Sequence, residues 1–275
     1  MELRHLRGFV AVAGSGTVIG AAEAIGLAPA SVSEQVRTLE RSLGVRLFDR
    51  TPQGMRLTPQ GHELLSRARG LLDHAEEVRR AVTGERLRMR VGALEMLTAT
   101  RFPAVVRRLR ERRPDIDLEV RSLPRHLLLG EIATGELDAG LMLDAGPQLG
   151  ALGFTPPRDL EFLDVGEVAL VMVEAPERTD PTMLVTSGQC SARLAADRVI
   201  DPSLPRRELP TVATVREWVR QGLGVAVLPD FVVEADLASG ALRRIAFDAP
   251  PLALRLAWQR GREDRLRDVL YALSA

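Results

Sequence analysis

The stretch from Thr17 to Thr58 constrains the fold of this chain more than any other part of its sequence. Thr17 is a good N-cap for a short helix of small residues, and Gly26 supplies the tight turn found between the two helices of a helix-turn-helix. A second helix is expected from about Ser31 to Leu43, because apolar residues recur there at helical spacing and form one buried stripe. The stripe consists of Val32, Val36, Leu39 and Leu43. Gly44 follows it and suits the left-handed conformation that ends many helices.

A short basic hairpin is expected directly after this pair of helices. Its turn is Pro52-Gln53-Gly54, and three arginines flank it, namely Arg46, Arg50 and Arg56. Cationic side chains on such a wing can lie along a phosphate backbone. The alternative is a hairpin whose arginines are merely solvated. Phosphate contact is the preferred interpretation, because all three cations flank one turn beside the second helix.

Two further helices are expected around this unit. A first helix ends at 14–16, and its core face carries Leu3, Leu6, Phe9, Val10 and Ala13. From about Pro59 to Thr83, apolar residues alternate at spacings of four and three, which is the a/d seam of a coiled coil. The seam residues are Leu64, Ala68, Leu71, Ala75, Val78 and Val82. The seam can pack on its own domain or pair with a second subunit, and pairing is the preferred interpretation.

After a break at 83–86, the pattern changes to strands that alternate with helices, which is typical of parallel sheets with crossover helices. The expected strands are 89–94, 116–123, 139–143, 163–173, 183–186, the buried run within GLGVAVLP at 222–229, and 252–258. The expected helices are one that carries Pro103 in its first turn, then 125–134, 215–221, 231–237 and 262–273. The strand at 163–173 would cross into a second subdomain and the strand at 252–258 would return. Two crossings predict two Rossmann-like halves joined by two strands.

Three runs, AAEAIGLAPASVSEQVRTLE, LGVRLFDRT and RLTPQGHELL, closely resemble the N-terminal domain of LysR-type transcriptional regulators. A looser likeness to the family's C-terminal domain rests on DIDLEV, GELDAGLM and VREWVRQGLGVAVLP. The resemblance implies an α/β protein with an all-α-type N-terminal winged helix-turn-helix, a long linker helix and a two-lobed, periplasmic-binding-protein-like effector domain. The implied boundaries are 1–60 for the DNA-binding domain, 61–88 for the linker or dimerisation helix and hinge, and 89–275 for the effector domain. Lobe I would comprise 89–162 and 259–275, and lobe II would comprise 163–258.

The N-terminal part of the second helix of a helix-turn-helix faces base edges in the major groove. The residues expected to bind DNA are therefore Pro29, Ala30, Ser31, Ser33, Glu34 and Arg37, with Arg50 and Arg56 on phosphates. The sequence departs from the common family pattern Ser-Gln-Pro-Ala-Leu-Ser-Arg-Gln, since Pro29 and Glu34 stand where Gln and Arg are usual. Glu34 can accept a hydrogen bond from a cytosine amino group. The equal alternative is a solvated acid or an ion pair with Arg37.

Ligands of such folds bind at the carboxyl ends of the parallel strands. The residues expected to bind the effector are Met96, Thr98, Thr100, Arg125, Leu143 and Thr214. In the family a hydroxyl that holds a carboxylate often stands at the position of Met96, and Thr98 and Thr100 are nearby substitutes. Arg125 falls on another family pocket position and would favour a small anionic or amphiphilic effector; its alternative is an exposed arginine at a helix start. Thr214 faces the cleft in the family arrangement, or caps a helix that begins at Val215.

Composition and the absence of known motifs argue against secreted, membrane-spanning and enzymatic proteins. The chain of 275 residues has formal net charge +0, and arginine supplies every cationic side chain except histidine, since lysine is absent. Cys190 stands alone, so no intrachain disulfide can form and a reducing compartment is natural. No apolar run reaches membrane-spanning length and no leader pattern precedes the domain, which predicts a cytoplasmic protein without membrane contact. No catalytic, cofactor or metal motif is found, so no enzyme, cofactor or metal site is expected.

The expected partners are double-stranded promoter DNA, a small-molecule effector and further copies of this chain. The resemblance implies a homodimer that assembles into a homotetramer. Two other classes compete with a regulator. One is a nucleoid protein that binds DNA without an effector, which would have no use for two ligand-binding lobes. The other is an enzyme on a binding-protein-like fold, for which Cys190 and the scattered histidines make a poor catalytic set.

Overall fold

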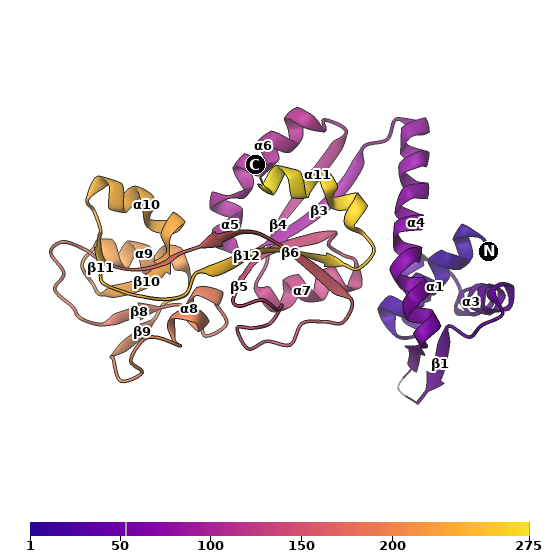
Figure 1. Ribbon diagram of the computed structural model, residues 1–275, viewed down its shortest axis with the longest axis horizontal. Helices are drawn as coiled ribbons and strands as arrows, with labels where there is room; N and C mark the ends of the chain where they lie inside the picture. The colour runs from indigo at the N-terminus through magenta and orange to yellow at the C-terminus, as the bar shows by residue number, and fades with distance from the viewer. Residues whose placement is uncertain (53, 275) are drawn as a thin grey trace.

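A computed structural model describes residues 1–52 and 54–274 of the chain, and side-chain surroundings up to residue 272. The chain forms three parts that follow one another in Figure 1: an N-terminal helical domain, one long helix, and two α/β lobes. Lobe I lies between the long helix and lobe II.

The N-terminal domain is a three-helix unit with a two-stranded wing. Its elements are α1 (Leu3–Ser15), α2 (Val18–Ile25), α3 (Pro29–Leu43), β1 (Phe48–Thr51) and β2 (Gly54–Leu57). As predicted, the Thr17 hydroxyl accepts the Gly20 N–H, and Gly44 ends α3 at φ 70°. Helix α3 begins two residues earlier than expected, because Pro29 suits a first helical turn, where a missing N–H leaves no hydrogen bond unmade.

The core of this domain follows the predicted stripes with two exceptions. Its buried residues include Leu6, Phe9, Val12, Val32, Val36, Leu39, Leu47 and Phe48. The Phe9 and Phe48 rings lie 5.3 Å apart at the centroids and join α1 to the wing. Leu3 and Leu43 were expected in the core, but both are exposed, because they lie at helix ends beyond the reach of a packed partner.

A backbone contact fixes the direction of the wing. The Met55 N–H donates to the Gly16 carbonyl over 2.8 Å. At Gly54, φ is +121° and a Cβ would lie 2.5 Å from the same carbonyl oxygen, so only glycine permits this approach. The wing therefore leaves the domain at an angle set by the end of α1.

Helix α4 (Pro59–Thr83) has the bounds predicted for the linker helix, and Gly84 ends it at φ 71°. The seam divides into two parts. Leu64 is partly buried and Ala68 is buried against the N-terminal domain, whereas Leu71, Val78 and Val82 expose 43%, 51% and 83% of their surface. The far half of α4 thus presents an uncovered apolar face, as a pairing helix would in a single subunit.

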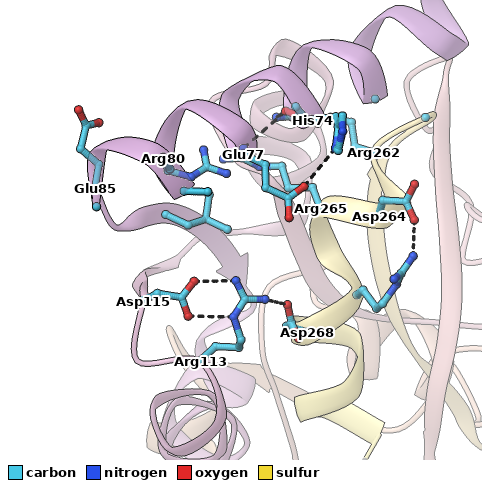
Figure 2. A pocket seen from close by; sticks show the side chains of 17 residues that line it. His74, Glu77, Arg80, Glu85, Arg113, Asp115, Arg262, Asp264, Arg265 and Asp268 are labelled. Carbon is cyan, nitrogen blue, oxygen red and sulfur yellow. Dashed lines mark hydrogen bonds and ion pairs between the residues drawn. The ribbon is translucent and has the colours of Figure 1, made fainter.

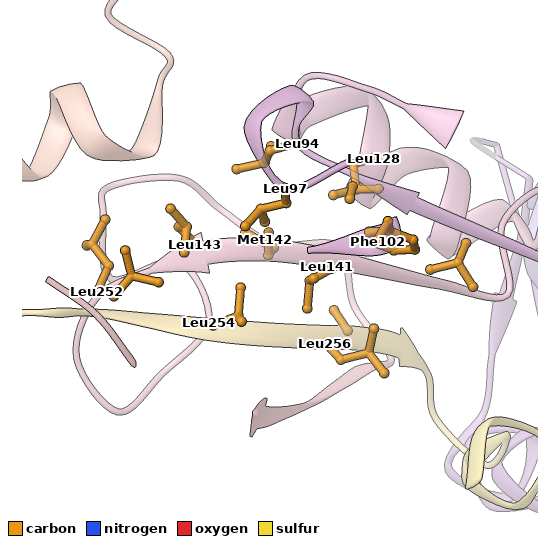
Figure 3. Close-up of a cluster of buried hydrophobic side chains, with 14 of the residues drawn as sticks. Leu94, Leu97, Phe102, Leu128, Leu141, Met142, Leu143, Leu252, Leu254 and Leu256 are labelled. Carbon is orange, nitrogen blue, oxygen red and sulfur yellow. The ribbon is translucent and has the colours of Figure 1, made fainter. Parts of the chain in front are cut away.

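Lobe I is built on a mixed five-stranded sheet with strand order β4-β3-β5-β12-β6. Its strands are β3 (Leu87–Ala93), β4 (Ile116–Ser122), β5 (Ala139–Asp144), β6 (Leu160–Val168) and β12 (Leu252–Gln259). Its helices are α5 (Glu95–Thr100), α6 (Phe102–Arg112), α7 (Arg125–Thr134) and α11 (Glu263–Ser274). Figure 3 shows the core between sheet and helices, where Leu141 of β5 and Leu256 of β12 are both fully buried.

Lobe II contains the second sheet, with strand order β11-β7-β10-β8-β9. Its strands are β7 (Leu170–Glu174), β8 (Met183–Val185), β9 (Arg206–Glu208), β10 (Val225–Pro229) and β11 (Arg243–Ile245). Its helices are α8 (Ser191–Ala196), α9 (Val212–Arg220) and α10 (Asp230–Ser239). The sequence patterns did not predict α8, β9 or β11, since each is too short to show a period.

The expected lobe boundaries, 163 and 258, are wrong. The single strand expected at 163–173 is two strands, and β6 and β12 pair along most of their length inside the sheet of lobe I. The chain therefore crosses after Val168 and returns before Leu252, which gives lobe II residues 169–251. The pattern missed this because β6 is a largely polar strand that merges with the apolar run of β7.

Four ionised side chains join α4 to lobe I, and we call them the joint network: Asp73, Asp138, Arg262 and Arg265. The Arg262 guanidinium donates two hydrogen bonds to Asp73, at 2.8 and 2.9 Å, and Arg265 donates to Asp138 at 3.2 Å. Asp138 is 2% exposed and also accepts the Arg90 N–H at 2.8 Å. Figure 2 shows Arg262 and Arg265 between α4 and α11.

Gly261 brings the backbones of the two parts into contact beside this network. Its φ is +81°, and a Cβ there would lie 1.9 Å from the Ser66 carbonyl oxygen of α4. We predict that Gly261→Ala loosens the joint and raises hydrogen exchange of α4 around residues 66–73. The matched control is Gly240→Ala, at φ +75° with nothing within 4 Å. Both variants should lose roughly 1–2 kcal/mol of folding stability, because alanine is strained in the left-handed conformation. Equal hydrogen-exchange rates at residues 66–73 in the two variants would contradict the prediction.

Candidate DNA interface and effector crevice

The outer face of α3 is free to meet another molecule because Val32, Val36 and Leu39 hold its inner face against the domain core. The predicted contact residues occupy the first two turns of the outer face. Pro29, Ala30, Ser31, Glu34 and Arg37 are exposed and Ser33 is half-buried. The structure therefore brings all six to one surface at the start of a helix-turn-helix second helix.

Glu34 has a partner that the sequence did not predict. Its carboxylate accepts hydrogen bonds from Arg41, at 2.5 Å, and from the Thr38 hydroxyl, at 3.2 Å. The alternative of an ion pair with Arg37 is not what the structure shows, because Arg41 lies two turns along the same helix face and its guanidinium reaches Glu34. Both members of the pair are exposed, so the pair is weak and leaves Glu34 able to turn towards a base edge.

The arginines of the wing form no ion pair with the described part of the chain. Arg46, Arg50 and Arg56 are exposed, and within the described residues no carboxylate lies within 4 Å of their guanidinium groups. Across the hairpin Arg50 faces Met55 and Arg56 faces Asp49 in the strand register. Unpaired, solvated guanidinium groups are suited to the phosphate role expected for Arg50 and Arg56.

Glu40 positions the wing relative to α3, and sequence reasoning missed it. Its carboxylate accepts the backbone N–H groups of Leu47 at 2.8 Å and Phe48 at 3.3 Å. A charged acceptor on two N–H groups at the start of β1 fixes the spacing between helix and wing. The only available signal was an acid near the end of a helix, where it opposes the helix dipole without a partner.

A second candidate site is the crevice between the two lobes, with a volume of about 340 Å³, which we call the inter-lobe crevice. Lobe I contributes Met96, Ser122 and Arg125, while lobe II contributes Ser187, Gln189, Cys190, Ser191 and Thr211. The carboxyl ends of β3 and β4 open into it, as expected for this kind of sheet. Met96 and Arg125 thus lie where the sequence predicted.

Arg125 spans the inter-lobe crevice. Its Nη1 donates to the Ser191 hydroxyl of lobe II over 3.0 Å, and its guanidinium stacks 4.4 Å from the centre of the Phe154 ring. Burial lowers the pKa of this guanidinium, while Asp144 and Cys190 act in the opposite direction. The alternative of an exposed arginine is wrong, because Phe154 and lobe II cover the side chain.

Four of the expected effector residues do not line the crevice. The Thr98 and Thr100 hydroxyls donate to the Glu95 and Met96 carbonyls of their own helix, at 2.7 and 2.6 Å. Leu143 is 0% exposed inside the core. Thr214 lies within α9, whose cap is Thr211: the Thr211 hydroxyl accepts the Thr214 N–H at 3.1 Å. The helix begins earlier than expected, so the cleft-facing threonine is Thr211.

The sequence analysis did not identify the polar residues that lobe II contributes to the inter-lobe crevice. Ser187 and Gln189 come from the loop before the short helix α8, Ser191 is the first residue of that helix, and Thr211 caps α9. Thr211 itself carried a visible signal, because threonine is a favoured N-cap residue. The loop before α8 carried no sequence signal, because its side chains line a crevice only once lobe I packs opposite them.

These features define a class: a winged-helix DNA-binding domain joined by a long helix to a two-lobed ligand-binding domain. Residues 83–272 match the family model "LysR substrate binding domain", and residues 3–62 match "Bacterial regulatory helix-turn-helix protein, lysR family". The chain belongs to the LysR family of transcriptional regulators. The predicted fold class and the predicted function, a DNA-binding regulator with an effector-binding domain, are confirmed.

Two relatives named as activators match over nearly the whole chain. The "Hca operon transcriptional activator HcaR" of Escherichia coli K12 is 30% identical over 294 residues, which cover 98% of this chain and 96% of the relative. The "Probable hydrogen peroxide-inducible genes activator" of Mycobacterium avium is 30% identical over 282 residues, covering 96% and 90%.

Solved structures share the fold. Full-length LysG of Corynebacterium glutamicum with its bound effector Arg has a TM-score of 0.68 at 19% identity, covering 100% of this chain and 97% of that one. A full-length point variant of OxyR from Pseudomonas aeruginosa has a TM-score of 0.60 at 23% identity, covering 99% and 94%. Across residues 1–52 and 54–274, no helix combines the length and apolar character needed to cross a bilayer.

We predict that Arg50→Ala weakens binding to specific and random duplexes alike and flattens the plot of log affinity against log salt by about one unit, because one phosphate contact is lost. Fluorescence anisotropy at several salt concentrations measures this. Arg267→Ala, which removes an exposed arginine of α11 far along the chain from the wing, is the matched control. An unchanged slope in Arg50→Ala would remove this residue from the contact surface.

Proposed function

We propose that this protein regulates transcription by binding double-stranded promoter DNA through α3 and the wing, under the control of a small anionic molecule in the inter-lobe crevice. The observation that carries the proposal is Arg125, a half-buried guanidinium that reaches across the crevice to Ser191. The proposed role is regulatory and not catalytic, and a regulator of chromosomal genes acts in the cytoplasm. The proposed domain division is the DNA-binding domain to about residue 60, the linker helix and hinge to 88, and the effector domain beyond.

We propose that the protein binds DNA as a pair of subunits, and that pairs assemble into a homotetramer. Leu71, Val78 and Val82 support pairing, because they leave a heptad seam uncovered on the outer half of α4. Two DNA-binding domains related by two-fold symmetry would contact an inverted repeat with half-sites ~34 Å apart. Pro29, Ala30, Ser31, Ser33, Glu34 and Arg37 would face the bases, with Arg50 and Arg56 on the phosphates.

The chemistry of the crevice favours an anion. Arg125 keeps N–H groups beyond the one that bonds Ser191, and the surrounding wall offers hydroxyls from Ser187, Ser191 and Thr211. An anion bound there would contact both lobes and so favour one relative position of the lobes. A tenfold shift of such an equilibrium requires a difference of about 1.4 kcal/mol in effector affinity between the two positions.

A gel shift with the upstream region of the gene itself, with and without small carboxylates, tests the function. A regulator binds this region in preference to random duplex, and one of the carboxylates changes the amount or the mobility of the protein–DNA complex. An enzyme on this fold would shift neither duplex, and a nucleoid protein would shift both alike and ignore every carboxylate.

We predict that Arg125→Ala weakens binding of the active carboxylate by about ten- to a hundredfold, since a hydrogen bond to a charged group contributes ~1.5–3 kcal/mol. Calorimetric titration of the full chain measures the change. Arg207→Ala, an exposed arginine on the outer strand β9 that stacks on Trp218, is the control and should bind as the parent does. Equal affinity in Arg125→Ala and the parent would rule out the anion.

A further inference from the structure

Arg69 is a buried cation that forms no salt bridge with the described residues. It lies on α4 and exposes 7% of its surface, and its Nε has no hydrogen-bond partner in the part of the chain that the structure describes. Its Nη1 donates to the Arg260 carbonyl at 3.4 Å. Among residues 1–52 and 54–272, no carboxylate lies within 4 Å of this guanidinium. Buried charges in proteins are normally paired, so this one calls for an explanation.

The two acids whose charges act on Arg69 do not pair with it. Asp73 forms ion pairs with Arg262 at 2.8 Å and Arg265 at 3.5 Å, and the Asp159 carboxylate lies 3.9 Å from a ring nitrogen of His62. Burial lowers the pKa of Arg69, and the charge of Asp159 opposes it only in part. The guanidinium is therefore under-neutralised inside the protein.

Arg69 lines a crevice of about 1080 Å³ between α1, α4 and lobe I, which we call the joint crevice. Five arginines and three acids line it, and two of the other arginines, Arg7 and Arg90, also form no ion pair within 4 Å in the described part of the chain. Beside these cations lie the apolar side chains of Val10, Ile25 and Leu72. Leu72 follows Arg69 by three residues and so shares its helix face.

We propose that the joint crevice binds a small amphiphilic carboxylate, whose anionic end pairs with Arg69 and whose apolar body covers Val10, Ile25 and Leu72. This site is separate from the inter-lobe crevice and goes beyond the function proposed above. Its occupant contacts α1 of the DNA-binding domain and lobe I together. Binding therefore favours the arrangement in which these two parts pack against each other.

Calorimetric titration of the full chain with octanoate, and with uncharged octanamide as the matched ligand, tests the proposal. Octanoate should bind saturably and at least tenfold more tightly than octanamide. Arg69→Met should abolish that preference. Arg125→Met removes the cation of the inter-lobe crevice, so binding that survives in it and is lost in Arg69→Met belongs to the joint crevice. Absence of saturable binding, or an affinity unaffected by Arg69→Met, would overturn the proposal.

Thermal melting gives a second measurement. Without ligand, Arg69→Met should melt at or above the temperature of the parent, because it removes an unpaired charge and keeps an apolar stem of similar length. Octanoate should raise the melting temperature of the parent and leave that of Arg69→Met unchanged. A variant that melts clearly lower, or fails to fold, would show that Arg69 is already satisfied within the protein, and the proposal would fail. Neither experiment measures DNA binding. The proposed ligand of the joint crevice can therefore fail while the proposed regulatory function stands, and the reverse.

Discussion

The joint network is the interaction on which the arrangement of this molecule depends. Asp73 belongs to α4, Asp138 precedes β5, Arg262 directly precedes α11 and Arg265 lies in its first turn. Both arginines form ion pairs with Asp73, which hold the linker helix on lobe I, and both also pair with Asp138 inside lobe I. All four side chains are largely buried. Removing one partner from such a network leaves a buried charge unpaired, which is far more destabilising than losing an exposed ion pair. The position of the DNA-binding domain relative to the lobes therefore rests on charge neutralisation at this point.

Strand β5 connects the joint to the inter-lobe crevice. It begins beside Asp138 and ends at Asp144, whose carboxylate accepts the N–H groups of Gly150 at 2.7 Å and Leu152 at 3.1 Å. Arg255 is 0% exposed and donates to Asp144 at 3.1 Å and to the Gln148 carbonyl at 2.6 Å. The loop held in this way leads to Phe154, on which Arg125 stacks. Strand β5 and the hydrogen bonds and ion pairs at its two ends thus connect the inter-lobe crevice to α4.

The candidate sites differ in how far the sequence could predict them. The DNA surface depends on one helix and one hairpin, so the exposed side of α3 follows from its buried stripe, and Pro29 to Arg37 lie together as expected. The inter-lobe crevice is formed by segments about a hundred residues apart, and only Met96 and Arg125 of the expected six residues line it. The hydroxyls of Thr98 and Thr100, which follow β3 in the sequence, were expected to line the crevice. Each instead donates a hydrogen bond to a backbone carbonyl of its own helix, because a threonine within a helix has such a carbonyl in reach.

The sequence by itself determined the local elements: the cap at Thr17, the glycine ends of α3 and α4, the bounds of α4, and the alternation of strands and helices in the lobes. These signals lie within a few residues of each other and act on the backbone directly. Only the tertiary structure decided that β6 and β12 share the sheet of lobe I, that Arg262 pairs with Asp73 at a separation of 189 residues, and that Arg69 pairs with no acid among the described residues. Such outcomes depend on which surfaces meet after folding, and neither periodicity nor capping carries that information.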